Sequence, residues 1–83
     1  MEKALIAVEN YLDSYLDDIS KSQGAYPLYL GKEKDTYYFL LSYKTPSLSG
    51  GIGLQQIYTY TTGIIKRDAS QKAFSFLSAY FKH

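Results

Sequence analysis

Hydrophobic residues recur every three to four positions along the first twenty residues of the chain. At 100° per residue they gather on one broad arc, and four carboxylates lie on the opposite side. The apolar arc holds Ala4, Leu5, Val8, Tyr11, Leu12, Tyr15, Leu16 and Ile19, and the polar arc holds Glu2, Glu9, Asp13 and Asp17. The pattern predicts an amphipathic helix over residues 2–20, followed by a terminating glycine at position 24.

The middle of the chain changes to strand patterns. Residues 25–31 are a short strand candidate, and Pro27 within them cannot donate a hydrogen bond to a neighbouring strand. This strand is therefore expected at an edge of the sheet, or to be irregular in its first half. After a polar turn, residues 36–44 are dense in aromatic and aliphatic side chains and carry the strongest strand signal.

The two faces of this central strand differ in bulk. Tyr37, Phe39, Leu41 and Tyr43 share one face, and Tyr38, Leu40 and Ser42 share the other. Because the first face is longer and bulkier, we expect it to be the core face and the second to be partly exposed.

The rest of the chain holds two further strand candidates and a closing helix. The segments are a loop at 45–51, strands at 52–60 and 64–67 joined by a turn, and a helix at about 69–82. Asp68 has the chemistry of an N-cap, and Gln71 three residues later completes a capping-box-like pair. The closing helix is expected to turn Ala69, Ala73, Phe76, Leu77 and Tyr80 inward.

These elements predict one α+β domain over residues 1–83. The expected order is an N-terminal helix, a three- to four-stranded antiparallel sheet and a C-terminal helix, with both helices packed on one sheet face. The core is expected to be set by Leu12, Leu16, Phe39, Leu41, Phe76 and Leu77.

Few residues of the chain have catalytic chemistry. There is no cysteine, and the one histidine is His83, the last residue. These facts exclude thiol nucleophiles and disfavour histidine-based catalysis and metal binding. The glycines of residues 50–53 precede a predicted strand instead of a helix, so they are not a phosphate loop. We expect no enzyme activity, no metal site and no cofactor.

The charge balance limits the kind of partner. Nine basic residues face eight acidic ones, which gives a net charge of +1 and disfavours a nucleic-acid binder. No apolar run approaches the roughly 20 residues of a membrane span. The N-terminal segment carries charges throughout, unlike a signal peptide. A cytoplasmic protein that binds another protein is the expected class, and a homo-oligomer stays open.

Two features suggest a binding surface. The carboxylates Glu9, Asp13 and Asp17 are either a solvated helix face or a patch directed at a basic partner, since Asp17 at the end of the predicted helix would oppose its dipole. The ten tyrosines fit the margins of a half-covered sheet first, a protein interface second and a base-stacking surface third. Tyr38, on the face expected to be open, is the predicted anchor of a partner.

Three stretches of the chain resemble the immunity protein 35 family of bacteria. They are YLDSYL in the first helix, DTYYFLLSY in the central strand and IYTYTTGII before the last helix. The resemblance implies a small cytoplasmic inhibitor that binds one toxin protein and neutralises it. Two other classes remain open: a phage-encoded anti-defence inhibitor, similar to anti-CRISPR proteins, and a structural or self-assembling module.

Overall fold

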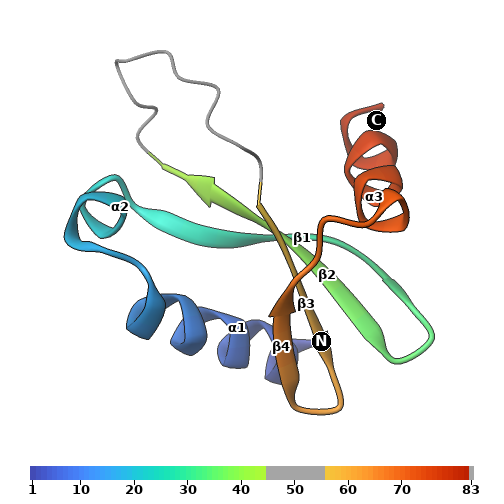
Figure 1. The fold of residues 1–83 in the computed structure, drawn as a ribbon, viewed down its shortest axis with the longest axis horizontal. Coiled ribbons are helices and arrows are strands. Elements are labelled where there is room, and N and C mark those ends of the chain that lie inside the picture. Colours follow the sequence, from blue (N-terminus) through green and yellow to red (C-terminus); the bar gives the residue numbers. More distant parts are fainter. Residues whose placement is uncertain (45–55, 83) are drawn as a thin grey trace.

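In the part of the chain that the structure describes, four antiparallel strands form the centre of the fold, with a helix before and a helix after them (Figure 1). The computed structural model of the protein describes residues 1–44 and 56–82. The elements in chain order are α1 (Glu2–Tyr15), α2 (Asp18–Ser22), β1 (Ala25–Glu33), β2 (Thr36–Tyr43), β3 (Ile57–Thr61), β4 (Ile64–Arg67) and α3 (Gln71–Phe81). The predicted α+β class and the helix–sheet–helix order are confirmed.

The strands follow one another in space as they do in sequence, in the order β1-β2-β3-β4. Two tight turns close the hairpins, and both use left-handed backbone: Lys34 has φ 54°, Thr62 φ 49° and Gly63 φ 84°. Such turns match the right-handed twist of the strands they join. Because β1 is an edge strand, the position predicted from Pro27 is confirmed.

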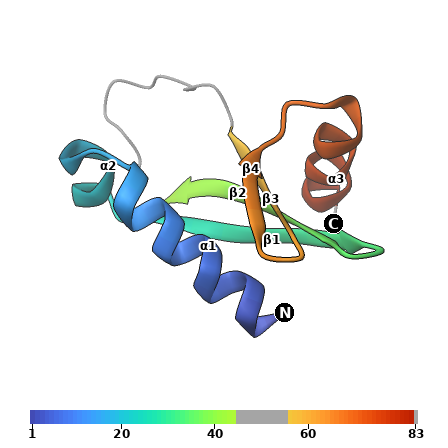
Figure 2. The same ribbon diagram turned by 60° about the horizontal axis from the view of Figure 1, so that its bottom comes forward.

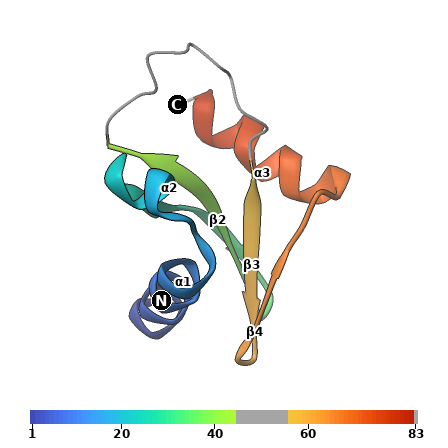
Figure 3. The same ribbon diagram turned by 60° about the vertical axis from the view of Figure 1, so that its left-hand side comes forward.

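The two long helices cover opposite faces of the sheet, as Figures 2 and 3 show. The first core cluster joins α1 to the sheet and comprises Ala4, Val8, Leu12, Phe39, Leu41 and Tyr58. The second joins α3 to the other face and comprises Tyr38, Leu40, Ile57, Ala73 and Leu77. The expectation that both helices pack on one face is therefore wrong.

The composition of β2 explains the three-layer arrangement. Its four central residues, Tyr38 to Leu41, are all buried, although successive side chains of a strand point to opposite faces. A strand that is apolar on both faces stabilises the fold most when both faces are removed from water. A helix on each side of the sheet does this. Of the six predicted core residues, Leu16 and Phe76 are partly buried and the other four are buried.

The first helix is shorter than its periodicity predicts. It ends at Tyr15, because Leu16 takes an extended backbone conformation with ψ 149°. The chain then turns into α2, whose first hydrogen bond runs from the Lys21 N–H to the Asp17 carbonyl at 3.1 Å. Asp17 and Asp18 thus lie at the beginning of a helix, where negative charge is favourable, and not at the end of one.

The last helix begins two residues later than expected. Ser70 is its N-cap, and the Ser70 hydroxyl accepts a 3.2 Å hydrogen bond from the Ala73 N–H. The carboxylate of Asp68, the predicted cap, instead accepts from the Ser70 N–H at 2.8 Å and supports the turn before the helix. Residues 45–51 of the predicted loop and 52–55 of the predicted strand lie outside the described residues.

Candidate functional site

The four predicted binding residues do not form one surface. Glu9 and Asp13 are exposed on the outer side of α1, and Asp17 is exposed in the bend between α1 and α2. Tyr38 lies on the opposite face of the sheet from α1 and is 5% exposed. The prediction that Tyr38 is exposed to a partner is wrong.

Tyr38 is buried because α3 covers it. Its ring stacks on the ring of Phe76, with centroids 4.3 Å apart and planes 16° from parallel. Gly31 of the neighbouring strand makes room for this stack, since a β-carbon at position 31 would lie 2.9 Å from Cδ1 of Phe76. Tyr38 therefore has a structural role in the second core cluster.

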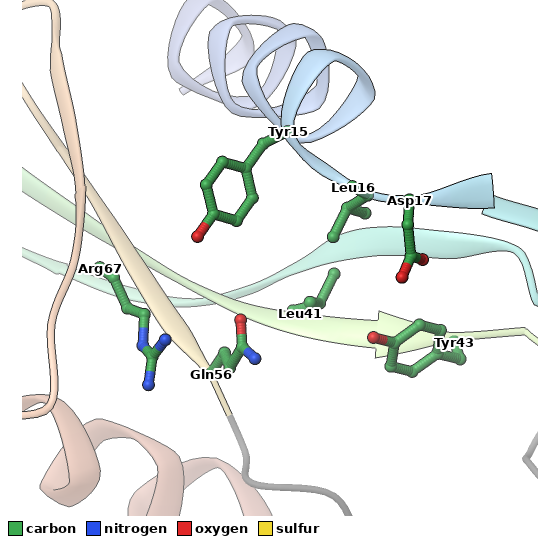
Figure 4. A pocket seen from close by; sticks show the side chains of 7 residues that line it. All are labelled: Tyr15, Leu16, Asp17, Leu41, Tyr43, Gln56 and Arg67. Atoms are coloured by element: carbon green, nitrogen blue, oxygen red, sulfur yellow. The ribbon is translucent and has the colours of Figure 1, made fainter. Parts of the chain in front are cut away.

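An open hollow of about 310 Å³ lies at the C-terminal end of α1 (Figure 4). It is lined by Tyr15, Leu16, Asp17, Leu41, Tyr43, Gln56 and Arg67. Tyr15 and Tyr43 are 60% and 38% exposed, so their rings are available to a partner. The hollow thus combines apolar leucines, two accessible tyrosines, a carboxylate and the sole arginine of the chain.

A line of aromatic contacts holds Tyr15 in place. Its ring stacks on Tyr11 one turn earlier in α1, with centroids 5.6 Å apart and planes 12° from parallel. Tyr11 in turn contacts Tyr58 of β3 at 5.9 Å. Because Tyr58 is 1% exposed, an exposed ring at the hollow is anchored through Tyr11 to the core.

Tyr58 also positions one polar group of the hollow. Its hydroxyl donates a 2.8 Å hydrogen bond to Oε1 of Gln56. Burial raises the pKa of the Tyr58 hydroxyl above its ordinary value, and the nearby Tyr15 and Tyr11 add to this effect. The hydroxyl is therefore a neutral donor at physiological pH, and it has no tendency to act as a base.

Charge is distributed unevenly along the chain. Five of the eight acidic residues lie within residues 1–18, beside one lysine, whereas residues 56–82 carry four basic residues and one acidic residue. The basic residues of this second segment do not share one face, because Arg67 lines the hollow beside α1 and Lys72 is paired with Glu33 of β1. The net charge of +1 therefore combines an acidic first helix with basic residues spread over the rest of the fold.

The exposed sides of α1 and α3 differ in chemistry. The acidic face of α1 comprises the exposed residues Glu2, Ile6, Glu9 and Asp13. The aromatic face of α3 comprises the exposed residues Phe74, Ser78 and Phe81. Both follow the spacing of three to four residues that places side chains on one side of a helix.

Reasoning from the sequence missed Tyr15, Tyr43 and Arg67 as members of a site. Tyr15 falls on the apolar arc of the first helix, and Tyr43 falls on the face of β2 assigned to the core, so both are predicted to be buried. Each is the last residue of its element, where cover from neighbouring layers ends. Position at an element's end is the signal that could have identified them.

No family model, no curated protein and no solved structure matches this chain. Within residues 1–44 and 56–82, no three carboxylate, thiol or imidazole groups come together as a metal site would require. None of the helices in that part of the chain is both long and apolar enough to cross a membrane.

Proposed function

We propose that this protein acts by binding another protein through the acidic face of α1 and the hollow at the C-terminal end of the same helix. The observation that supports this is the pair of exposed tyrosines, Tyr15 and Tyr43, beside a helix with a run of carboxylates. Tyrosine is enriched in protein interfaces because its rigid ring buries a large area at low entropic cost. The carboxylates add attraction toward a basic surface.

The proposal keeps the predicted role of Glu9 and Asp13 and changes the anchors. Tyr15 and Tyr43 replace Tyr38, whose ring is buried under α3. Asp17 belongs to the hollow, but its carbonyl also begins α2, so its role in a partner contact is not separable from its role in the bend. Glu9 and Asp13 are therefore the better residues for a test.

In biological terms, we propose a small inhibitor that binds and blocks one protein in the cytoplasm, without catalysis. The resemblance to the immunity protein 35 family favours a toxin as the partner. A phage-encoded inhibitor of a bacterial defence protein would use the same surface chemistry. The gene beside this one distinguishes them, because a toxin gene supports the first function and a phage operon supports the second.

Affinity capture from the native host, followed by mass spectrometry, tests the proposal when two baits are compared. The first is the unaltered protein and the second carries Glu9→Lys, Asp13→Lys and Tyr15→Ala. We expect a protein that the first bait enriches and the second loses. A third bait with Phe81→Ser, changed on the opposite side of the molecule, is the control and should retain it. A partner held equally by the first two baits would place the binding surface elsewhere.

A further inference from the structure

The hollow at the end of α1 has a polar end that the exposed tyrosines and the carboxylates of α1 do not account for. It is formed by Arg67, the last residue of β4, and by Gln56, which directly precedes β3. Arg67 is the register partner of Tyr58, and directly opposite residues of neighbouring strands project to the same face of a sheet. Arg67 therefore stands on the α1 side of the sheet, beside a buried tyrosine.

The guanidinium group of Arg67 is available to a ligand. In residues 1–44 and 56–82 the ion pair that forms is Lys72 with Glu33, and no carboxylate of that part of the chain pairs with Arg67. Arg67 is also exposed to solvent. An arginine keeps its charge at every physiological pH, and its planar fork of N–H donors fits the two oxygens of a carboxylate. The hollow thus contains a permanent anion-binding group.

Gln56 adds two further donors at the same end. The Tyr58 hydroxyl donates a 2.8 Å hydrogen bond to Oε1 of Gln56 and so engages the acceptor of that side chain. The amide nitrogen of Gln56 keeps its two N–H donors for a ligand. Burial raises the pKa of Tyr58, and the nearby guanidinium of Arg67 opposes this rise. Arg67 and Gln56 therefore form one donor-rich end around the Tyr58 hydroxyl.

The rest of the hollow is mainly apolar and aromatic. Leu16 and Leu41 lie between the rings of Tyr15 and Tyr43, and Asp17 lies at the end opposite Arg67 (Figure 4). The volume of about 310 Å³ is at the lower limit of ligand pockets, which are about 300–1,000 Å³. The hollow therefore suits a single residue of a partner, with an anion at one end and an apolar group beside it.

We infer that the hollow receives a carboxylate of the partner protein at Arg67 and Gln56, with the neighbouring apolar group packed on Leu16 and Leu41. This inference rests on the proposed function, because it names what the partner inserts into the hollow. Two sources supply this chemistry. One is a C-terminal residue with an apolar side chain, and the other is an Asp or Glu side chain next to an apolar residue.

The carboxylates around α1 favour a protein over a nucleic acid as the source of the anion. Glu9, Asp13 and Asp17 would repel a chain of phosphates, and a single arginine neutralises only one of them. A protein can place basic side chains opposite Glu9 and Asp13 and one carboxylate opposite Arg67. The complementary partner surface is therefore mixed in charge, with one acidic group bordered by basic groups.

Small carboxylates test the hollow without the partner. In NMR titrations of the ¹⁵N-labelled chain, N-acetyl-leucine should shift the signals of the Arg67 Nε–H and the Gln56 side-chain amide, with a dissociation constant on the order of 1–10 mM. N-acetyl-leucinamide lacks the charge and acetate lacks the apolar group, so each should bind at least about tenfold more weakly. The capped tripeptide leucine–glutamate–leucine distinguishes the two sources. Tighter binding than that of N-acetyl-leucine indicates a side-chain carboxylate, and weaker binding indicates a chain terminus.

Substitutions on β4 supply a matched pair of variants. Arg67→Gln should weaken the binding of N-acetyl-leucine at least about tenfold, because it removes both the charge and the fork. Lys66→Gln removes the same charge from the next residue, which faces the other side of the sheet opposite Thr59, and it should change the affinity by less than about twofold. Circular dichroism checks that both variants are folded. If Arg67→Gln is unfolded, Arg67→Lys takes its place and should weaken binding more than Lys66→Gln does.

Several results would overturn the inference. They are equal binding of N-acetyl-leucine and its neutral amide, equal losses in Arg67→Gln and Lys66→Gln, and shifts that do not include Arg67 or Gln56. Tighter binding of inorganic phosphate than of N-acetyl-leucine would indicate a phosphate site instead.

The affinity capture described above separates this inference from the proposed function. A partner that is kept by an Arg67→Gln bait and lost by the bait altered at Glu9, Asp13 and Tyr15 would confirm the surface and refute the carboxylate. If no partner is captured, the proposed function fails, whereas binding of N-acetyl-leucine at Arg67 still assigns the hollow to a carboxylate.

Discussion

Tyr38 of β2 and Phe76 of α3 form a stacked pair, with ring centroids 4.3 Å apart. This pair joins the last helix to the sheet, because Phe76 is the aromatic side chain of α3 that packs against the second core cluster. Its integrity can be tested by substitution on either side of the stack.

Phe76→Ala should lower the free energy of unfolding by about 2–4 kcal/mol, because it removes the stack and uncovers Tyr38. Urea denaturation followed by circular dichroism measures the change. Phe81→Ala is the matched control on the same helix, since Phe81 is 62% exposed, and it should change the stability by no more than about 0.5 kcal/mol. Equal losses in the two variants would contradict the assigned inner face of α3.

Gly31→Ala should destabilise the protein by about 1–3 kcal/mol, because its methyl group would meet the Phe76 ring at 2.9 Å. The cause can be isolated with a double-mutant cycle. In a chain that already carries Phe76→Ala, the same glycine substitution should cost less than in the unaltered protein, and the remaining cost is the backbone strain of a side chain at φ 157°. An unchanged cost would mean that the backbone at position 31, and not the ring, opposes a side chain.

Phe39→Ala and Leu40→Ala should both destabilise the protein, each by about 2–5 kcal/mol. The two side chains point to opposite faces of β2, and they are 0% and 5% exposed. A sheet with one wet face would tolerate one of the two substitutions. Thermal melting of both variants is the measurement, and a stable Leu40→Ala variant would mean that α3 does not cover its face of the sheet.

The stability should fall at alkaline pH through Tyr58. Burial raises the pKa of its hydroxyl in the folded state above the ordinary value of 10.0. The unfolded chain therefore loses this proton first, so the contribution of Tyr58 is intact below pH 10 and is lost as the pH rises above it. Urea denaturation at about pH 8 and about pH 11 should show a smaller loss in Tyr58→Phe than in the unaltered protein. Equal losses would remove Tyr58 as the cause.

With a partner in hand, the two parts of the proposed surface should affect different rate constants. Glu9→Lys with Asp13→Lys should mainly slow association and reduce its dependence on salt. Tyr15→Ala should mainly speed dissociation and cost about 2 kcal/mol or more. Surface plasmon resonance measures both rates, and Phe81→Ser is the control. If none of these variants changes either rate, the acidic face is simply solvated.

The type and order of the elements could be predicted from sequence because they depend on local patterns. The α1 helix follows the spacing of its apolar residues, and the hairpin turns follow the chemistry of Lys34–Asp35 and Thr62–Gly63. The end of α1 could not be predicted in this way. Leu16 continues the apolar spacing, and the bend after Tyr15 depends on how α2 packs against β1.

The sequence also holds the signal that both faces of the sheet are covered. The run from Tyr38 to Leu41 has no polar residue on either face, which is typical of a strand covered on both sides. The hollow is harder to predict, because Tyr15, Tyr43 and Arg67 come from three distant segments. Their proximity depends on the placement of α1 over the sheet, which no local pattern contains.

The order of the strands also determines how the chain can fold as it is synthesised. Each strand pairs with the one made just before it, so the sheet and the α1 layer can assemble before the last residues exist. Tyr38, Leu40 and Ile57 nevertheless stay in contact with water until α3 is complete and docks. A nascent chain that stalls before residue 71 would therefore expose a broad apolar sheet face, and such intermediates are prone to aggregate and to be recognised by chaperones.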